Sequence, residues 1–280
     1  MIHALLLAAT LVAAATPSPA PSAAAPIVSP TASAAATPAG TPTPYRTLPP
    51  NAHVWQGITP GGSAPAVHAK LGVPLLARVL PDGSIINWYP GPTTNAYMIV
   101  GERDKIVQYV RAFPISLEGA LDGLKDPYGV SPGLDYTAIK ALRGEAKEAR
   151  QVAPGTVVVV YQDSQGFVWL YELTAAGVHA ISLYDANAPK ANPAAPPVSD
   201  PHDGASMGRA YLVHARNEQE GLRFERYYAT HRGGCSVWTV ANQTVLSVGA
   251  RKIDQLDLQC EDNKDQTSMF FDVTSFMGKN

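Results

Sequence analysis

The amino-acid sequence predicts an α+β fold: two tandem repeats, each a helix followed by a three-stranded antiparallel meander, and then a small all-β module. Two observations support this class. Residues 57–61, Gly-Ile-Thr-Pro-Gly, recur 72 positions later (129 − 57) as Gly-Val-Ser-Pro-Gly at 129–133. Beyond residue 206, short runs rich in β-branched and aromatic residues alternate with turn residues, as is typical of a small β module.

The repeat extends well beyond that first motif. A single register held over a long stretch indicates that one structural unit has been duplicated. Without a gap, the same offset pairs Ala66 with Ala138, Ala69 with Ala141, Gly72 with Gly144, Arg78 with Arg150, Gly83 with Gly155, Tyr89 with Tyr161 and Tyr97 with Trp169.

Each unit is expected to begin with a short helix. Ser63 and Asp135 are equivalent, and either side chain can cap a helix by accepting hydrogen bonds from first-turn amides. Gly72 and Gly144 follow at equivalent positions, where glycine tolerates the left-handed conformation that ends a helix. The predicted helices are 64–71 and 136–143, with a further helix at 117–124.

Strands are predicted from β-branched and aromatic enrichment between turn residues. In the repeats they are expected at 84–89, 95–101 and 105–112, and again at 156–161, 166–173 and 177–184. In the C-terminal module they are expected at 209–216, 222–231, 236–240, 244–248, 253–258 and 269–273.

The residues at the start of the first unit resemble a known family. Gly-Ile-Thr-Pro-Gly, a capped short helix, Leu-Gly-Val-Pro at 71–74 and a strand ending in Trp-Tyr are similar to the pattern of the BamE (SmpA/OmlA) lipoproteins. The tandem arrangement is similar to the β-lactamase inhibitory protein, which has that fold in two copies. The resemblance covers residues 55–185. The second copy departs from the pattern, because Arg-Gly-Glu-Ala at 143–146 lacks the leucine and the proline, and no lipobox cysteine is present.

The N-terminal segment is typical of a signal peptide. Residues 4–15 are a single apolar run, whose helix of roughly 18 Å is too short for a bilayer core. Three alanines at 13–15 provide a small-x-small cleavage site. We therefore expect a secreted or periplasmic protein of the cell envelope, with no transmembrane span in the mature chain. In an exported protein the two cysteines, Cys235 and Cys260, are expected to form a disulfide.

Composition excludes one large class of function. The chain has 280 residues and a formal net charge of −2, so it lacks the broad basic surface that nucleic-acid binding needs. Tracts rich in alanine and proline are expected to be linkers. The predicted division is a signal peptide (1–15), a disordered linker (16–50), a first repeat (51–114), a second repeat (115–185), a second linker (186–206) and the C-terminal module (207–280).

Aromatic residues alternate along the repeat strands. At 166–173 they share one face of the strand, and aliphatic residues share the other. Two interpretations stay open: the rings form the core, or they form an open surface that binds a partner. The candidate binding residues are Trp88, Tyr89, Tyr97, Tyr161, Phe167, Trp169 and Tyr171.

Few groupings point to catalysis. Gly-Ala-Ser-Met-Gly at 204–208 matches the G-x-S-x-G string, but it leads into a predicted strand rather than a helix. Asp200, His202 and Asp203 offer only three possible metal ligands, in one loop. No phosphate-binding or dinucleotide-binding glycine string occurs. The sequence therefore predicts no enzyme activity, no cofactor and no metal.

The favoured hypothesis is an exported, non-catalytic binding protein whose sheet face binds a protein or an envelope component. Two alternatives remain at this stage. One is an envelope hydrolase with a site between the repeats and the C-terminal module, using Ser206, Asp203 and either His202 or His231. The other is a structural envelope spacer without a specific ligand.

Overall fold

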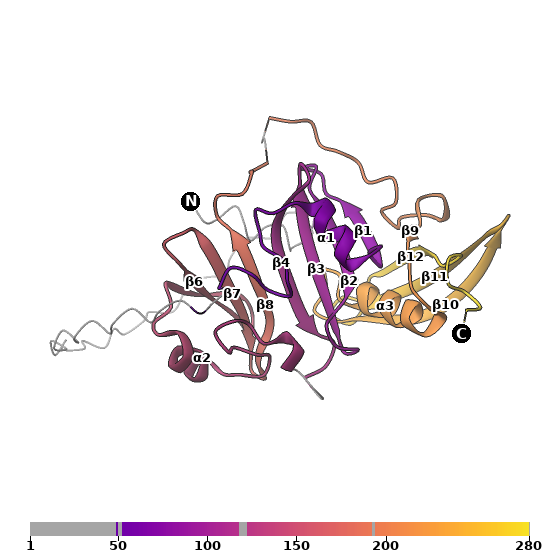
Figure 1. The fold of residues 1–280 in the computed structure, drawn as a ribbon. Helices are drawn as coiled ribbons and strands as arrows, with labels where there is room; N and C mark the ends of the chain where they lie inside the picture. The colour runs from indigo at the N-terminus through magenta and orange to yellow at the C-terminus, as the bar shows by residue number, and fades with distance from the viewer. Residues whose placement is uncertain (1–48, 50–51, 118–121, 192–193, 280) are drawn as a thin grey trace, which may run out of the picture. The chain divides into compact units, whose positions relative to one another are not determined.

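The computed structural model describes residues 49, 52–117, 122–191 and 194–279 (Figure 1). They belong to one unit of the chain, Leu48–Asn280. The predicted signal peptide and all but one residue of the first predicted linker lie outside the described residues. No helix in the described ranges is long and apolar enough to cross a membrane.

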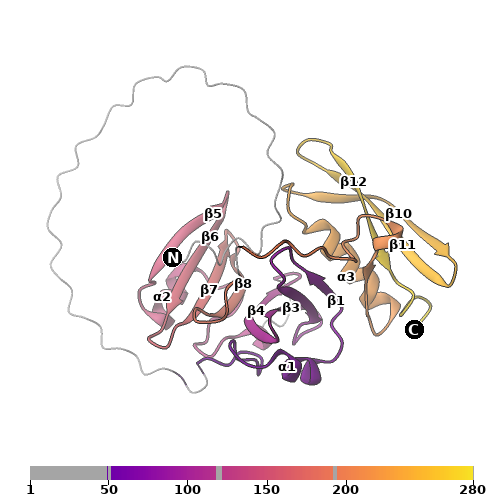
Figure 2. The ribbon, with the colours of Figure 1, turned by 90° about the horizontal axis from the view of Figure 1, so that it is seen from above.

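A large antiparallel sheet contains most of the strand residues. Its eight strands lie in the order β1-β2-β3-β4-β8-β7-β6-β5. Helix α1 precedes the first four strands in the chain and α2 precedes the last four, and each helix lies beside its own half of the sheet (Figure 2). The elements are α1 (Ala64–Leu71), β1 (Leu76–Val79), β2 (Ile85–Pro90), β3 (Ala96–Arg103), β4 (Ile106–Pro114), α2 (Tyr136–Arg143), β5 (Glu148–Ala153), β6 (Thr156–Gln162), β7 (Phe167–Thr174) and β8 (Gly177–Asp185).

The predicted α+β class with three-stranded repeats is wrong. The described chain is mostly β, each of these helices is followed by four strands, and all eight strands belong to one sheet. The strands missed by the sequence analysis are β1 and β5, which form the two edges of the sheet. Edge strands are often short or carry charged residues, so their sequences resemble loops. β1 has only four residues, and β5 contains Glu148 and Arg150.

The predicted helices at 64–71 and 136–143 are confirmed. Gly72 and Gly144 follow them with φ of 81° and 84°, a backbone conformation that favours glycine. Asp135 caps α2 by accepting from the Ala138 N–H at 2.8 Å, whereas the Ser63 hydroxyl makes no capping hydrogen bond. Of the helix predicted at 117–124, residues 118–121 lie outside the described ranges. The rest contains only a 3₁₀ turn at Asp122–Leu124.

The C-terminal module contains a helix, so the prediction of an all-β module is also wrong. Residues 222–231, predicted as a strand, belong to α3 (Glu218–Thr230). Asn217 caps this helix by accepting from the Glu220 N–H at 2.9 Å. Its aromatic side chains recur at helical spacing on the buried face, and this tertiary packing overrides their strand propensity.

The strands of the module form a second sheet in the order β10-β11-β12-β9, with β9 parallel to β12. The runs predicted at 236–240 and 244–248 are one strand, because a bulge at Ala241 interrupts the pairing without ending it. The predicted Cys235–Cys260 disulfide is confirmed. The strands are β9 (Tyr211–Leu212), β10 (Trp238–Val248), β11 (Arg251–Cys260) and β12 (Gln266–Asp272).

Two hydrophobic cores lie on opposite faces of the large sheet. The first, here the helix-side core, contains Val67 of α1 and Ile139 of α2 together with one face of the sheet. The second, here the module-side core, packs the opposite face of the sheet against α3 and the module, with Phe224 at 0% exposure. The large sheet and the C-terminal module therefore share a core, and this contact creates a cleft between them.

Candidate functional site

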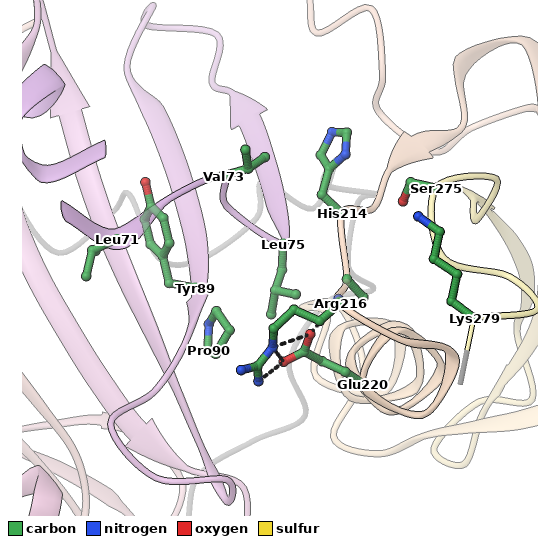
Figure 3. A pocket seen from close by; sticks show the side chains of 11 residues that line it. Leu71, Val73, Leu75, Tyr89, Pro90, His214, Arg216, Glu220, Ser275 and Lys279 are labelled. Atoms are coloured by element: carbon green, nitrogen blue, oxygen red, sulfur yellow. Dashed lines mark hydrogen bonds and ion pairs between the residues drawn. The ribbon is translucent and has the colours of Figure 1, made fainter. Parts of the chain in front are cut away.

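A cleft of about 570 Å³ lies where the end of α1 and the start of β1 meet the C-terminal module. Figure 3 shows residues from both sides of it. A backbone hydrogen bond joins the two sides, since the His214 N–H donates to the Leu75 oxygen at 2.9 Å. Val73 lines the cleft and is 69% exposed, so its side chain is accessible to a ligand. The apolar side is lined by Leu71, Val73, Leu75, Tyr89 and Pro90.

The opposite side of the cleft is polar and comes from the module. Its residues include His214, Arg216, Glu220, Ser275 and Lys279. The C-terminal segment is held against the start of α3 by two hydrogen bonds. The Glu218 N–H donates to the Lys279 oxygen at 3.1 Å, and the Gly278 N–H donates to Glu218 Oε2 at 2.8 Å. These contacts place Lys279 at the cleft.

The charges in the cleft do not cancel. Arg216 Nη2 donates to Glu220 Oε1 at 2.6 Å, and the Arg216 N–H donates to Oε2 at 2.8 Å. Burial alone would raise the pKa of Glu220, but these hydrogen bonds outweigh it and hold the pKa below its ordinary value. Within the described ranges, the side chains of Lys279 and His214 make no hydrogen bond or ion pair. Among the described residues, the Lys279 ammonium thus has no anionic partner and lies beside an apolar wall.

The candidate aromatic residues lie mostly in the two cores. Trp88 and Phe167 are partly exposed, whereas the other five expose 6% or less. The sequence left open whether the rings form the core or an open binding surface. These five rings belong to the core. The helix-side core contains Tyr89, Tyr161, Trp169 and Tyr171, with Phe167 packed against it, and the module-side core contains Tyr97, with Trp88 packed against it.

The predicted equivalence of Tyr97 and Trp169 in the two repeats is wrong, and the reason is the length of one loop. The ungapped offset aligns Tyr97 with Trp169, yet these rings lie on opposite faces of the sheet. The loop between β2 and β3 spans 91–95, whereas the loop between β6 and β7 spans 163–166 and is one residue shorter. A shift of one residue moves every side chain of a strand to the other face. As a result, the cross-strand partner of Tyr89 is Met98, whereas that of the equivalent Tyr161 is Trp169.

The rings of the second half surround the chain's own Arg143. Its guanidinium carbon lies 3.5 Å from the centre of the Tyr128 ring and 4.6 Å from that of Tyr161. Tyr171 donates to Asp126 Oδ2 at 2.5 Å and accepts from Arg143. Burial raises the pKa of Asp126, and hydrogen bonds to its carboxylate oppose that shift only in part. The aromatic cluster is therefore filled by a cation of the same chain.

A second polar cluster lies in the first half of the sheet. His68 Nε2 lies 3.1 Å from Glu102 Oε2, and His68 Nδ1 lies 2.7 Å from the Tyr89 hydroxyl. Asn87 also donates to Glu102, at 3.2 Å. Burial, followed by the charge of Glu102, raises the pKa of Tyr89 to about 12, so this hydroxyl stays protonated at neutral pH. Both ring nitrogens of His68 are engaged, which suits a role in packing rather than in binding.

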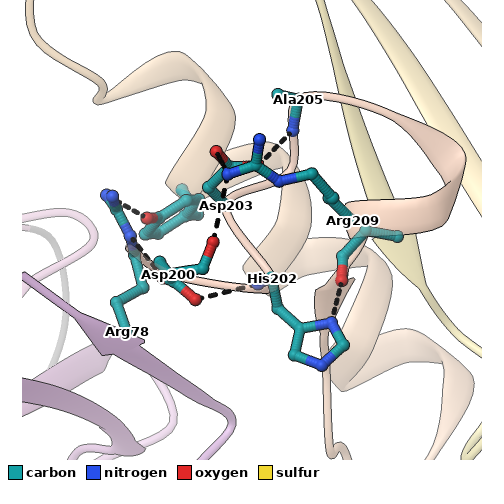
Figure 4. Close-up of polar contacts among 8 residues, drawn as sticks. Arg78, Asp200, His202, Asp203, Ala205 and Arg209 are labelled. Carbon is teal, nitrogen blue, oxygen red and sulfur yellow. Dashed lines mark hydrogen bonds and ion pairs between the residues drawn. The ribbon is translucent and has the colours of Figure 1, made fainter. Parts of the chain in front are cut away.

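The loop tested for hydrolase and metal chemistry is occupied by internal contacts (Figure 4). Asp203 pairs with Arg209, and His202 Nδ1 donates to the Ala210 oxygen at 3.2 Å. His231 Nδ1 donates to the Tyr227 oxygen at 2.8 Å. No hydrogen bond joins Ser206 to either histidine in the part of the chain that the structure describes. The structure therefore shows no hydrogen-bonded serine–histidine pair for the hydrolase hypothesis within the described residues.

Close groups of metal-ligand side chains are scarce. Among the described residues, one group of three lies within coordinating distance: Cys235, Cys260 and Asp262. Both sulfurs belong to the disulfide, and Asp262 accepts from the Ser236 N–H at 2.8 Å. Metal binding through cysteine requires free thiolates, so this group is not suited to it.

The module also buries a carboxyl pair that the sequence analysis missed. Glu225 of α3 and Asp254 of β11 are both fully buried, and their side chains contact each other. Gln243 donates to Asp254 Oδ2 at 2.5 Å, but neither oxygen of Glu225 receives a hydrogen bond from a donor in the described ranges. Burial, reinforced by Asp254, raises the pKa of Glu225 well above its ordinary value.

The cleft itself could not be located from the sequence. Its apolar residues are separated from its polar ones by more than 100 positions, and only the packing of the module against the sheet brings them together. The Leu-Gly-Val-Pro segment at 71–74 provides a local signal, since it places Val73 on a turn between a helix and an edge strand. No comparable signal exists for Lys279.

Comparisons with known proteins add little. No family model matches the chain, and no curated protein matches it. Among solved structures, a DUF4309 family protein (YjgB) from Bacillus subtilis is similar, with 14% identity and a TM-score of 0.35, over 46% of this chain and 83% of that one. A cysteine-rich secretory protein from Staphylococcus aureus is similar over 51% of this chain and 53% of that one, with 12% identity and a TM-score of 0.30. At these scores neither similarity supports an argument about function.

Proposed function

We propose that this chain is an exported binding protein and that its cleft binds the carboxyl-terminal end of a partner polypeptide. The observation that carries the proposal is the Lys279 ammonium, which has no partner within the described ranges and lies opposite an apolar wall that includes the exposed Val73. A volume of about 570 Å³ is within the usual range for ligand sites. Of the seven aromatic residues of the original hypothesis, Tyr89 alone lines this cleft, and it is only 1% exposed.

Export is supported by the Cys235–Cys260 disulfide. Disulfides persist in oxidising compartments and are rare in the cytosol. The apolar run at 4–15 is consistent with a secretory signal, although it lies outside the described residues.

The chemistry of the cleft favours a carboxylate attached to an apolar group. Lys279 supplies donors for an anion, and a charge-assisted hydrogen bond is stronger than a neutral one. Leu71, Val73 and Leu75 supply a surface for aliphatic side chains next to that anion. The last residues of an apolar polypeptide combine both features, whereas a neutral envelope sugar has neither.

Calorimetric titration tests this proposal. The probe is a short peptide that ends in Val-Leu with a free carboxylate, and the matched probe is its carboxyl amide. We expect binding of the acid, weaker binding of the amide, and a loss of about tenfold in affinity for Lys279→Ala, the scale of one charge-assisted hydrogen bond. The control is Lys190→Ala, which changes an exposed lysine distant in sequence from the cleft.

Two results would contradict the proposal. One is equal affinity for the acid and the amide, which would mean that no group in the cleft recognises the carboxylate. The other is unchanged affinity in Lys279→Ala. Failure of both peptides to bind would favour the structural spacer over a binding protein of this kind.

A further inference from the structure

The second sheet has a long, open edge. β10 lies at the end of the order β10-β11-β12-β9, so one side of its backbone has no strand partner among the described residues. Its 11 residues, Trp-Thr-Val-Ala-Asn-Gln-Thr-Val-Leu-Ser-Val, include no charged side chain. Most of them are exposed. Such an edge can pair with another strand through its free N–H and C=O groups.

The edges of the large sheet are protected, and this contrast makes β10 informative. β5 carries Glu148 and Arg150, whose side chains approach each other at 3.4 Å. At the β1 edge, the Val198 N–H donates to the Pro81 oxygen at 2.8 Å and the His214 N–H donates to Leu75. Charged residues and covering segments are the usual means of preventing edge pairing. In the described part of the chain, the only such device on the β10 edge is the bulge at Ala241, near the start of the strand.

Beyond that bulge, the regular part of β10 runs from Asn242 to Val248 and is centred on Val245. Val245 is 47% exposed and lies opposite Asp254 of β11. An antiparallel pair of two such segments about this centre would place Val245 against its own copy and Asn242 against Val248. All side chains that meet in this arrangement are neutral, so no like charges oppose each other.

We propose that two copies of this chain pair through antiparallel β10 strands centred on Val245, which joins their second sheets into one continuous sheet. A two-fold arrangement requires a surface that is complementary to itself, and a neutral strand with a central valine meets this requirement. The formal net charge of −2 adds little repulsion between the copies. This inference is independent of the cleft and of its ligand.

Sedimentation of the purified, oxidised chain over a wide concentration range tests the proposal. We expect a monomer–dimer equilibrium for the natural chain. Val245→Lys places two ammonium groups face to face and removes the central apolar contact, so the dissociation constant should rise by about tenfold or more. The control is Val152→Lys, the same substitution at a 46% exposed valine on the protected β5 edge, and it should leave the equilibrium unchanged.

Circular dichroism of each variant checks that its fold is intact. We expect no change, because both valines are exposed. A natural chain that stays monomeric at every concentration overturns the proposal, as does a dimer that Val245→Lys leaves intact. A monomer that takes up an unrelated strand-forming peptide at β10 would also overturn it, because the edge would then serve another protein's strand rather than a second copy.

Discussion

Arg143 lies against the face of Tyr128, with its guanidinium carbon 3.5 Å from the ring centre. The side chain of Arg143 is only 7% exposed, and the side chain of its acidic neighbour Asp126 is fully buried. A buried cation is stable only when its charge and its donors are satisfied. Here the tyrosine rings and Asp126 compensate the charge of Arg143, and the Tyr171 hydroxyl accepts a hydrogen bond from it. These aromatic residues therefore stabilise the fold.

Replacing Arg143 by methionine should destabilise the protein by about 3 kcal/mol, because Asp126 would lose the charge that compensates it inside the core. Urea unfolding measures the change. Arg143→Lys should recover only part of the loss, since an ammonium group lacks the planar contact with the rings. Lys140→Met on the exposed face of the same helix is the control and should change stability by less than about 0.5 kcal/mol. Equal effects at positions 140 and 143 would contradict this account.

The Glu225–Asp254 pair predicts that stability falls as the pH rises. The pKa of each carboxyl is raised above its ordinary value, 4.5 for Glu225 and 3.8 for Asp254, chiefly by burial. The folded protein therefore keeps a proton that the unfolded chain releases. The stability from this proton is fully present below pH 3.8 and is lost as the pH rises through the raised values.

Glu225→Gln should remove the part of that loss of stability that comes from Glu225. Its amide can donate to Asp254 Oδ1, which receives no hydrogen bond in the described structure, and it carries no charge to bury. We expect the variant to be about 2 kcal/mol more stable than the natural protein at pH 7, with a smaller difference near pH 4. Thermal unfolding over this pH range is the measurement, and Glu261→Gln at an exposed position is the control. A variant less stable than the natural protein at pH 7 would show that the pair is stabilising when ionised.

The disulfide should contribute substantially to the stability of the module. Cys235 and Cys260 are separated by 25 positions, and closing a loop of this length stabilises by about 3 kcal/mol on the chain-entropy model. The double variant Cys235→Ala/Cys260→Ala should unfold at correspondingly lower urea concentration. The natural protein in reducing agent should unfold at a similarly lowered urea concentration. If reduction leaves the unfolding midpoint unchanged, the bridge does not constrain the unfolded chain.

Local signals in the sequence predicted single elements well. Gly72 and Gly144 marked the ends of both short helices, and six strands of the large sheet lie within two residues of their predicted positions. The edge strands β1 and β5 were missed because short or charged edges lack the apolar pattern of a central strand. Aromatic enrichment in 222–231 indicated a strand, but packing of Phe224 and its neighbours selected a helix.

The candidate sites depended on which face each side chain occupies, and there the sequence was less informative. One residue more in the β2–β3 loop puts Tyr97 on the face opposite to Trp169. Alternation along a strand shows that residues share a face, but it does not show what covers that face. The aromatic rings are covered by α1, α2 and α3, whereas the cleft depends on residues from distant parts of the chain.

The most direct test of the cleft as the ligand site is an amide NMR titration of the ¹⁵N-labelled chain with the free-carboxylate peptide. We expect the amide signals of Val73, His214 and Lys279 to shift with added peptide, while those of Trp169 and Tyr171 in β7 stay in place. Shifts confined to β7 and its aromatic residues, with the cleft signals unchanged, would contradict the account and return the binding site to the face of the sheet.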